Sequence, residues 1–225
     1  MIDPHQQLQD ALDALDTAFA PLAELPVQVG GCTYCYAEAD LEALAGPVQA
    51  LSEHLLTSVA HESPDHWDDF PGLYRRLVPR IVRLLVADEL DHSLVASRLL
   101  AAAWPDWPAG ERRALEAVWH AWWRSALDTD PGVGRIADVL ETLSVTAGTL
   151  SSWLAVWGET RTETADRHLH DMLDRWLFED QLADLHLGFY GELHATEQLL
   201  SWLLSLEDGR VGAAQLREVE RISYS

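Results

Sequence analysis

The chain has two cysteines, and both lie in residues 30–35, a segment that reads Gly-Gly-Cys-Thr-Tyr-Cys and that we call the knuckle. Two thiols three residues apart on a glycine turn can share a metal ion or form a disulfide. A short stretch with extended character, residues 25–29, leads into the knuckle. Cys32 and Cys35 are therefore the residues for which the sequence predicts chemistry most directly.

Zinc is the first candidate ligand of the knuckle. A tetrahedral zinc site needs four ligands, and Cys32 and Cys35 have the spacing of zinc-binding cysteine pairs. His54 and His61 are seven residues apart, so on one helix they project from nearly the same face, and His66 follows in the next loop. We expect Cys32, Cys35, His54 and His61 to hold the metal. In an alternative, two copies of the chain form a homodimer and share a four-thiolate site.

Other interpretations of the knuckle stay open. It could be a tight turn whose thiols are buried or free. It could be a dithiol redox centre, because a helix N-terminus lowers the pKa of a CxxC thiol. However, the βαβ pattern that accompanies thioredoxin-like centres is missing from the sequence. A permanent disulfide is disfavoured in the reducing cytoplasm, where we expect this protein to reside.

The charge balance argues against some partners. The 225 residues include 37 acidic and 15 basic ones, which gives a formal net charge of -22. This negative field repels phosphate backbones and anionic lipids, so neither a nucleic acid nor a membrane is an expected partner. Every basic residue is arginine, which excludes lysine-dependent chemistry such as Schiff-base formation. The N-terminal residues have no cationic region and no long apolar run, so they do not predict a signal peptide.

Helices must position these side chains. Apolar residues recur at three- and four-residue spacing nearly throughout, which predicts an all-α chain of antiparallel helical hairpins. The hairpins would form either a HEAT-like α-solenoid or an irregular helical bundle. The expected helices span residues 5–20, 37–45, 47–61, 68–87, 91–103, 109–127, 133–147, 149–157, 160–177, 179–206 and 212–222. We expect a single domain over residues 1–225, with a sub-boundary near residues 158–162 as an alternative.

Tryptophan is unusually frequent, with ten residues in the chain. Trp119, Trp122 and Trp123 fall at positions i, i+3 and i+4 and form a stripe along one side of a helix. Trp104 and Trp107 are each followed by a proline, which forbids a helix, so we expect an exposed loop there. Because tryptophan dominates interface energetics, these five residues predict an aromatic groove that binds a protein or peptide partner.

Two further groups of histidines and carboxylates could form polar sites. Glu89 and His92 have the Glu-x-x-His spacing of di-metal carboxylate sites, but the sequence has no second copy of the motif. The second group could meet in a pocket between the last two long helices and consists of His168, His170, Asp171, His186, Glu192 and His194. Solvated helix faces and hydrogen-bonded histidines are the favoured explanation of the second group.

The stretch from Pro26 to Leu85 resembles the start of a family of uncharacterised proteins from GC-rich bacteria. Members of that family open with a Gly-Cys-x-x-Cys knuckle, followed by a leucine-rich segment, an Asp-Phe pair and a Leu-Pro-Arg helix. The matching elements here are residues 31–35, Leu41–Leu51, Asp69-Phe70 and Val78–Ile81. The resemblance implies a knuckle followed by helices, and it carries no activity.

We therefore expect a non-enzymatic, all-helical scaffold that binds a protein or peptide through an aromatic groove on an acidic surface. The alternative is a metal-binding protein or metalloenzyme, with zinc as the candidate ion at the knuckle and nearby histidines. Glycine-rich phosphate loops, Gly-x-Ser-x-Gly elbows and His-Glu-x-x-His sequences do not occur in the chain, which makes an enzyme the less favoured class.

Overall fold

A computed structural model describes residues 3–25, 27–131, 135–178, 182–207 and 209–223 of the chain. The described residues form eleven α-helices and one two-stranded sheet, which confirms the predicted all-α class. Residue contacts divide the chain into two compact units, Met1–Ala121 and Trp122–Ser225, each built mainly of helices. The single domain and the HEAT-like repeat stay predictions.

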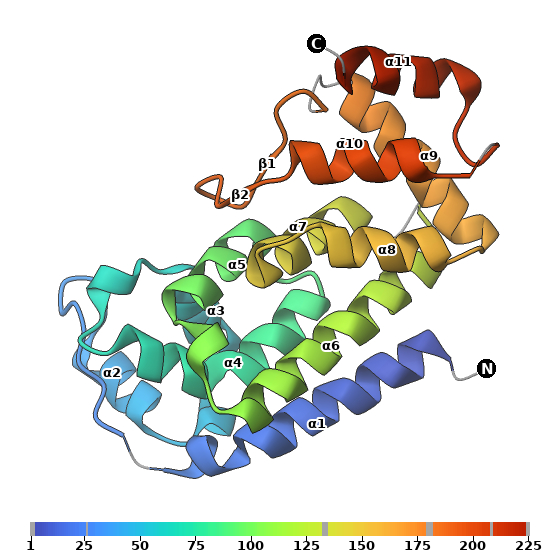
Figure 1. The fold of residues 1–225 in the computed structure, drawn as a ribbon. Coiled ribbons are helices and arrows are strands. Elements are labelled where there is room, and N and C mark those ends of the chain that lie inside the picture. The colour runs from blue at the N-terminus through green and yellow to red at the C-terminus, as the bar shows by residue number, and fades with distance from the viewer. Residues whose placement is uncertain (1–2, 26, 132–134, 179–181, 208, 224–225) are drawn as a thin grey trace. The chain divides into compact units, whose positions relative to one another are not determined.

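The first unit contains helices α1 to α5 and the first part of α6 (Figure 1). Its elements are α1 (Pro4–Glu24), α2 (Glu38–Ala45), the short helix η1 (Val48–Ala50), α3 (Glu53–His61), the short helix η2 (Pro64–His66), α4 (Phe70–Val86), α5 (His92–Ala101), the short helix η3 (Trp104–Asp106) and α6 (Ala109–Asp128). The division between the two units falls within α6.

The central helix of the first unit is α4, which contacts α1, α3 and α5. The Asp69 side chain caps the start of α4 by accepting a hydrogen bond from the Gly72 N–H at 3.0 Å. Apolar side chains on several sides of α4 are buried, among them Leu73, Val82 and Leu85. A helix that is apolar on most sides must be covered by neighbours, which explains its central position.

A buried arginine in α4 joins the ends of two other helices. Arg76 is 4% exposed, and its guanidinium donates hydrogen bonds to backbone oxygens at the ends of α1 and α2. The acceptors are the carbonyl oxygens of Leu22, Ala23, Leu44 and Gly46. Helix C-termini carry unpaired carbonyl groups and partial negative charge, so one buried cation can satisfy both ends. Burial lowers the pKa of Arg76.

The second unit contains the rest of α6 and the elements up to α11 (Figure 1). These elements are α7 (Ile136–Ala147), α8 (Ser151–Glu159), α9 (Glu163–Phe178), β1 (His186–Leu187), β2 (Leu193–His194), α10 (Thr196–Ser205) and α11 (Ala213–Ser223). Helix α10 contacts α8 and α11, and α11 also contacts α9. The buried Arg210 donates to carbonyl oxygens of Trp157, Gly158 and Thr160 at the end of α8. In both units, a buried arginine thus donates hydrogen bonds to backbone carbonyl oxygens at helix ends.

The prediction of a continuous helix over residues 179–206 is wrong. Residues 179–181 lie outside the described residues, and a β-hairpin in which β1 pairs antiparallel with β2 follows. Gly188 and Gly191 have φ angles of 94° and 70°, a conformation that favours glycine, and they shape the turn of the hairpin. The two glycines interrupt the helical pattern, so α10 begins only at Thr196.

The starts of two other helices also differ from the prediction. The helix expected over residues 47–61 is divided into η1 and α3, because Ser52 caps α3 with its side chain. A serine at this position favours a new helix start over a continued helix. Residues 133–134 of the helix expected over 133–147 lie outside the described residues, and α7 begins at Ile136.

Candidate functional site

The knuckle is held next to the loop that precedes α4. Gly31 forms an antiparallel bridge with Trp67, and the Cys32 N–H donates to the His66 carbonyl oxygen at 2.8 Å. A Cβ atom at Gly31 would lie 2.9 Å from the Trp67 ring and 3.0 Å from the His66 carbonyl oxygen. Only glycine therefore allows this close approach, which brings His66 beside the cysteines.

The two thiols lie close together in a tight turn. The N–H groups of Cys35 and Tyr36 donate to the Cys32 carbonyl oxygen at 3.1 and 3.0 Å. Hydrogen bonds from the backbone of Cys35 and Tyr34, and from the Cys35 side chain, lower the pKa of Cys32. The pKa of Cys35 is raised, chiefly because its thiol donates to Cys32. Cys32 is therefore the thiol that ionises more readily.

His66 completes a group of three metal-ligating side chains. The donor atoms of Cys32, Cys35 and His66 all lie within 4.8 Å of one another. Ligand atoms of tetrahedral zinc are about 3.5–3.8 Å apart, so binding would require the donor atoms to approach one another by at most about 1 Å. The Nδ1 atom of His66 is buried and has no hydrogen-bond partner within the described part of the chain. The Oε1 atom of Glu62 lies 3.5 Å from this nitrogen, so a carboxylate stands next to the three donors.

His54 and His61 do not join the cysteines. His54 is exposed on α3. His61 is half-buried, its Nε2 accepts a hydrogen bond from the Asp91 N–H at 3.0 Å, and burial lowers its pKa. Among the residues that the structure describes, neither histidine belongs to a group of three or more metal-ligating side chains. The group of donors at the knuckle therefore contains His66 in place of His54 and His61, because the bridge after α3 brings His66 beside the cysteines.

A second group of metal-ligating side chains lies on the hairpin of the second unit. Asp184, His186 and His194 are exposed, and their donor atoms also lie within 4.8 Å of one another. The Nε2 atoms of both imidazoles lie 3.0 and 3.4 Å from Asp184 Oδ1, and the rings stack 4.7 Å apart. Pairing with this carboxylate accounts for the arrangement without a metal. His168 does not join this group, because its Nε2 lies 2.8 Å from the Thr129 carbonyl oxygen.

The five tryptophans of the predicted aromatic groove are buried. Their exposed fractions are between 0% and 7%, and they are Trp104, Trp107, Trp119, Trp122 and Trp123. The Trp107 ring packs edge to face on Phe19, and its N–H donates to the Ala102 carbonyl oxygen at 2.9 Å. Large aromatic side chains with internal hydrogen-bond partners belong to a core. The predicted exposed loop at Trp104 and Trp107 is therefore wrong, and these five rings do not form an open groove.

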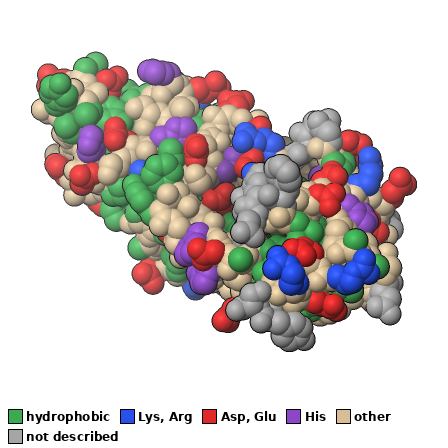
Figure 2. Space-filling view, turned by 90° about the horizontal axis from the view of Figure 1, so that it is seen from above, with side chains coloured by type: hydrophobic (Ala, Val, Ile, Leu, Met, Phe, Trp, Pro, Cys, Tyr) green, Lys and Arg blue, Asp and Glu red, His purple; other side chains and the backbone are tan. Residues whose placement is uncertain are grey.

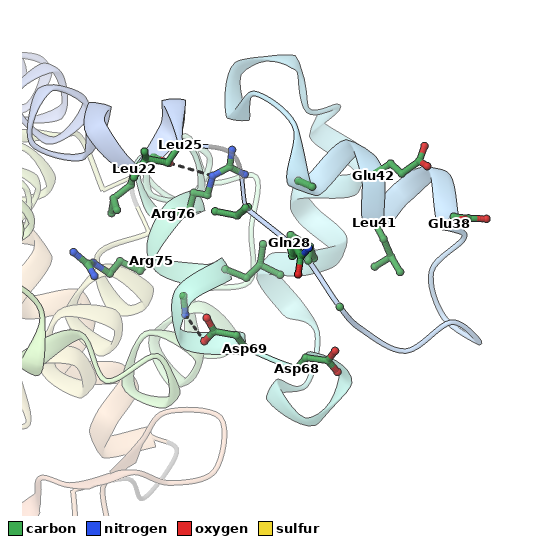
Figure 3. A pocket seen from close by; sticks show the side chains of 16 residues that line it. Leu22, Leu25, Gln28, Glu38, Leu41, Glu42, Asp68, Asp69, Arg75 and Arg76 are labelled. Atoms are coloured by element: carbon green, nitrogen blue, oxygen red, sulfur yellow. Dashed lines mark hydrogen bonds between the residues drawn. The ribbon is translucent and has the colours of Figure 1, made fainter.

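An open pocket of about 840 Å³ lies beside the knuckle in the first unit (Figure 3). Its apolar lining comes from α1 and the segment that follows it, from α2 and from α4: Leu22, Leu25, Val27, Val29, Leu41, Ala45 and Leu73. Gly30 and Asp68 also line the pocket, and the Asp68 N–H donates to the Gly30 carbonyl oxygen at 3.0 Å. The pocket therefore borders the knuckle, and Gly30 belongs to both. Sequence patterns did not reveal the pocket, because its residues come from separate elements.

No protein-family model, curated protein or solved structure matches the chain. The resemblance noted for residues 26–85 stays a prediction, and Pro26 itself lies outside the described residues. Within the described ranges, no helix has both the length and the apolar character that crossing a bilayer requires. The function must therefore be inferred from the chemistry of the knuckle and its surroundings.

Proposed function

We propose that the protein binds a zinc ion at the knuckle, with Cys32, Cys35 and His66 as ligands. The observation that carries this proposal is the convergence of three donor atoms within 4.8 Å from segments that are far apart in the sequence. Two thiolates and an imidazole form a ligand set that suits zinc, whereas magnesium and calcium prefer oxygen ligands.

The charges around the knuckle favour a bound cation. The Glu62 carboxylate opposes the ionisation of both Cys32 and Cys35. A divalent cation between these groups would offset the repulsion and hold both sulfurs as thiolates. The backbone N–H groups that point to the Cys32 sulfur would then orient a metal ligand, as outer hydrogen bonds do in metal sites.

A fourth ligand would complete the coordination of zinc. Glu62 is the nearest source within the chain, since its carboxylate lies beside His66. The knuckle of a second copy in a homodimer is the other source. A fourth protein ligand would make the site structural, whereas an exchangeable water would leave the position that catalytic zinc sites keep open. In the cytoplasm, the location that we expect, both thiols stay reduced and available for the metal.

Metal content tests the proposal. Mass spectrometry of untagged protein purified without chelators should find zinc in the wild type and none in the Cys32→Ser/Cys35→Ser variant. Circular dichroism of both proteins controls for unfolding of the variant. A wild-type protein that contains no zinc and takes up none when zinc is added would contradict the proposal. If its thiols then oxidise reversibly to a disulfide, the knuckle is a dithiol redox centre instead.

The predicted binding of a protein or peptide partner is a second candidate function. The five tryptophans of the predicted aromatic groove are buried, so they do not offer a binding site for this partner. The observation that favours it now is the open pocket beside the knuckle, whose lining is largely apolar.

A further inference from the structure

We propose that the pocket beside the knuckle binds an extended peptide segment of a partner protein, with basic and apolar side chains in alternation, which adds as a strand along residues 27–29. This inference goes beyond metal binding, and it does not require a metal at the knuckle. It depends on three features of the first unit: an unpaired stretch of backbone, an apolar lining and exposed carboxylates.

Residues 27–29 present an open backbone edge, and they run as an extended trace past Gln28 in Figure 3. None of their N–H and C=O groups forms a hydrogen bond to another described residue. The following residue is paired, because Gly30 accepts a hydrogen bond from Asp68. Unpaired backbone groups on an exposed edge are a template for strand addition. An extended peptide can satisfy these groups, whereas a small organic cation has no backbone to pair with them.

The apolar lining leaves room for side chains of such a peptide. Leu41 of α2 and the buried Leu73 of α4 both contribute to the lining (Figure 3). Leu25 is 54% exposed and Val27 is 36% exposed, so apolar surface at the pocket is left in contact with water. Burial of this surface would stabilise a complex. Because alternate residues of a strand point to the same side, apolar residues at every second position would enter the pocket.

The exposed charges at the pocket are negative. Its exposed carboxylates belong to Glu38 and Glu42 of α2 and to Asp68 and Asp69 before α4 (Figure 3). The two arginines of the lining are already engaged. Arg75 points away and donates two hydrogen bonds of 2.6 Å to Glu111, and Arg76 donates to backbone oxygens. Charge complementarity therefore selects a basic ligand. Acidic side chains are scattered over the face seen in Figure 2, in keeping with the net charge of -22.

The test uses a fluorescently labelled octapeptide of alternating valine and arginine and the full chain, in about 150 mM NaCl. Fluorescence anisotropy should show saturable binding, and a peptide of alternating valine and glutamate should not bind. The Glu38→Gln/Glu42→Gln variant should bind the arginine peptide about fivefold more weakly, because two surface charge pairs are lost. The matched control is Glu53→Gln/Glu116→Gln, which removes two exposed carboxylates outside the pocket and should leave binding unchanged.

A version of the arginine peptide with N-methylated valines tests the mode of binding, because it lacks half of the backbone N–H groups. It should bind at least tenfold more weakly if the peptide adds as a strand. Equal binding of both versions, equal weakening by the two double variants, or no binding of the arginine peptide would each overturn the proposal. All of these variants keep Cys32, Cys35 and His66, so failure of this proposal is distinguishable from failure of zinc binding.

Discussion

His66 is the residue that we propose as the third zinc ligand, and its substitution tests the ligand set. We expect His66→Asn to weaken zinc binding by more than about 100-fold, because loss of a ligand should exceed the effect of losing an outer hydrogen-bond partner. The control is His54→Asn/His61→Asn, which should bind zinc like the wild type. Competition with a chromophoric chelator measures both affinities. Unchanged affinity of the His66 variant would remove this residue from the site.

We expect Tyr74 to make the protein less stable at alkaline pH. Its ring is buried, its hydroxyl donates to the Ala60 carbonyl oxygen at 3.4 Å, and burial raises its pKa above the ordinary value of about 10. Below pH 10 or so both folded and unfolded states keep the proton, and this contribution to stability is complete. Above that pH the unfolded state ionises first, so stability falls until the folded pKa is reached.

The Tyr74→Phe variant isolates this effect. Relative to the variant, the wild type should lose up to about 1.4 kcal/mol of unfolding free energy per pH unit above pH 10. Urea unfolding of both proteins at several pH values between about 9 and 11 measures the difference. Parallel stability curves would show that Tyr74 ionises as easily in the folded protein as in the unfolded chain.

At the scale of elements, the bridge between the knuckle and the loop before α4 depends on Gly31. We expect Gly31→Ala to destabilise the first unit by about 1–3 kcal/mol, because its Cβ atom would collide with Trp67 and with the His66 backbone. The matched control is Gly110→Ala in α6, where a Cβ meets nothing within 4 Å. This control should stabilise the protein by about 0.5–1 kcal/mol. Denaturant unfolding of both variants tests the pair, and equal effects would contradict the close approach at Gly31.

The difference between local and distant interactions decides what the sequence could predict. Apolar periodicity predicts a helix over residues 68–87, and α4 spans nearly that range because Asp69 supplies the cap. The bridge between Gly31 and Trp67 joins two segments through tertiary contacts, and no local pattern encodes it. His66 was visible as a neighbour of the predicted site, but its position beside the cysteines depends on that bridge. The same holds for the pocket, which several elements build together.

At the scale of the whole molecule, composition predicted the amount of aromatic side chain but not its location. Nine of the ten tryptophans are buried, and Trp202 is half-buried. Two units of about a hundred residues each have a high ratio of surface to volume, so each needs large apolar side chains to fill its core. The tryptophan stripes at helical spacing are therefore packing surfaces. The sequence alone could not distinguish a stripe that packs against the chain from one that faces a partner.

The net charge of -22 makes stability depend on salt. Repulsion among carboxylates destabilises the compact state, and salt screens this repulsion. We expect the unfolding free energy to rise by on the order of 1 kcal/mol between about 10 and 300 mM NaCl. Urea unfolding at several NaCl concentrations measures the trend, with potassium fluoride as a second salt to separate screening from specific anion effects. A fall in stability with salt would mean that ion pairs such as Arg75 with Glu111 outweigh the repulsion.

The position of Arg76 has a consequence for the kinetics of any ligand of the pocket. Its guanidinium links the ends of α1 and α2 to α4, and all three helices contribute to the lining. Moving the three helices apart would leave the Arg76 guanidinium buried without its hydrogen-bond partners, which costs several kcal/mol. The cavity is thus formed before a ligand arrives, and association needs no opening step. Its rate would follow diffusion and electrostatic attraction, and a ligand too wide for the preformed cavity would be rejected by its shape.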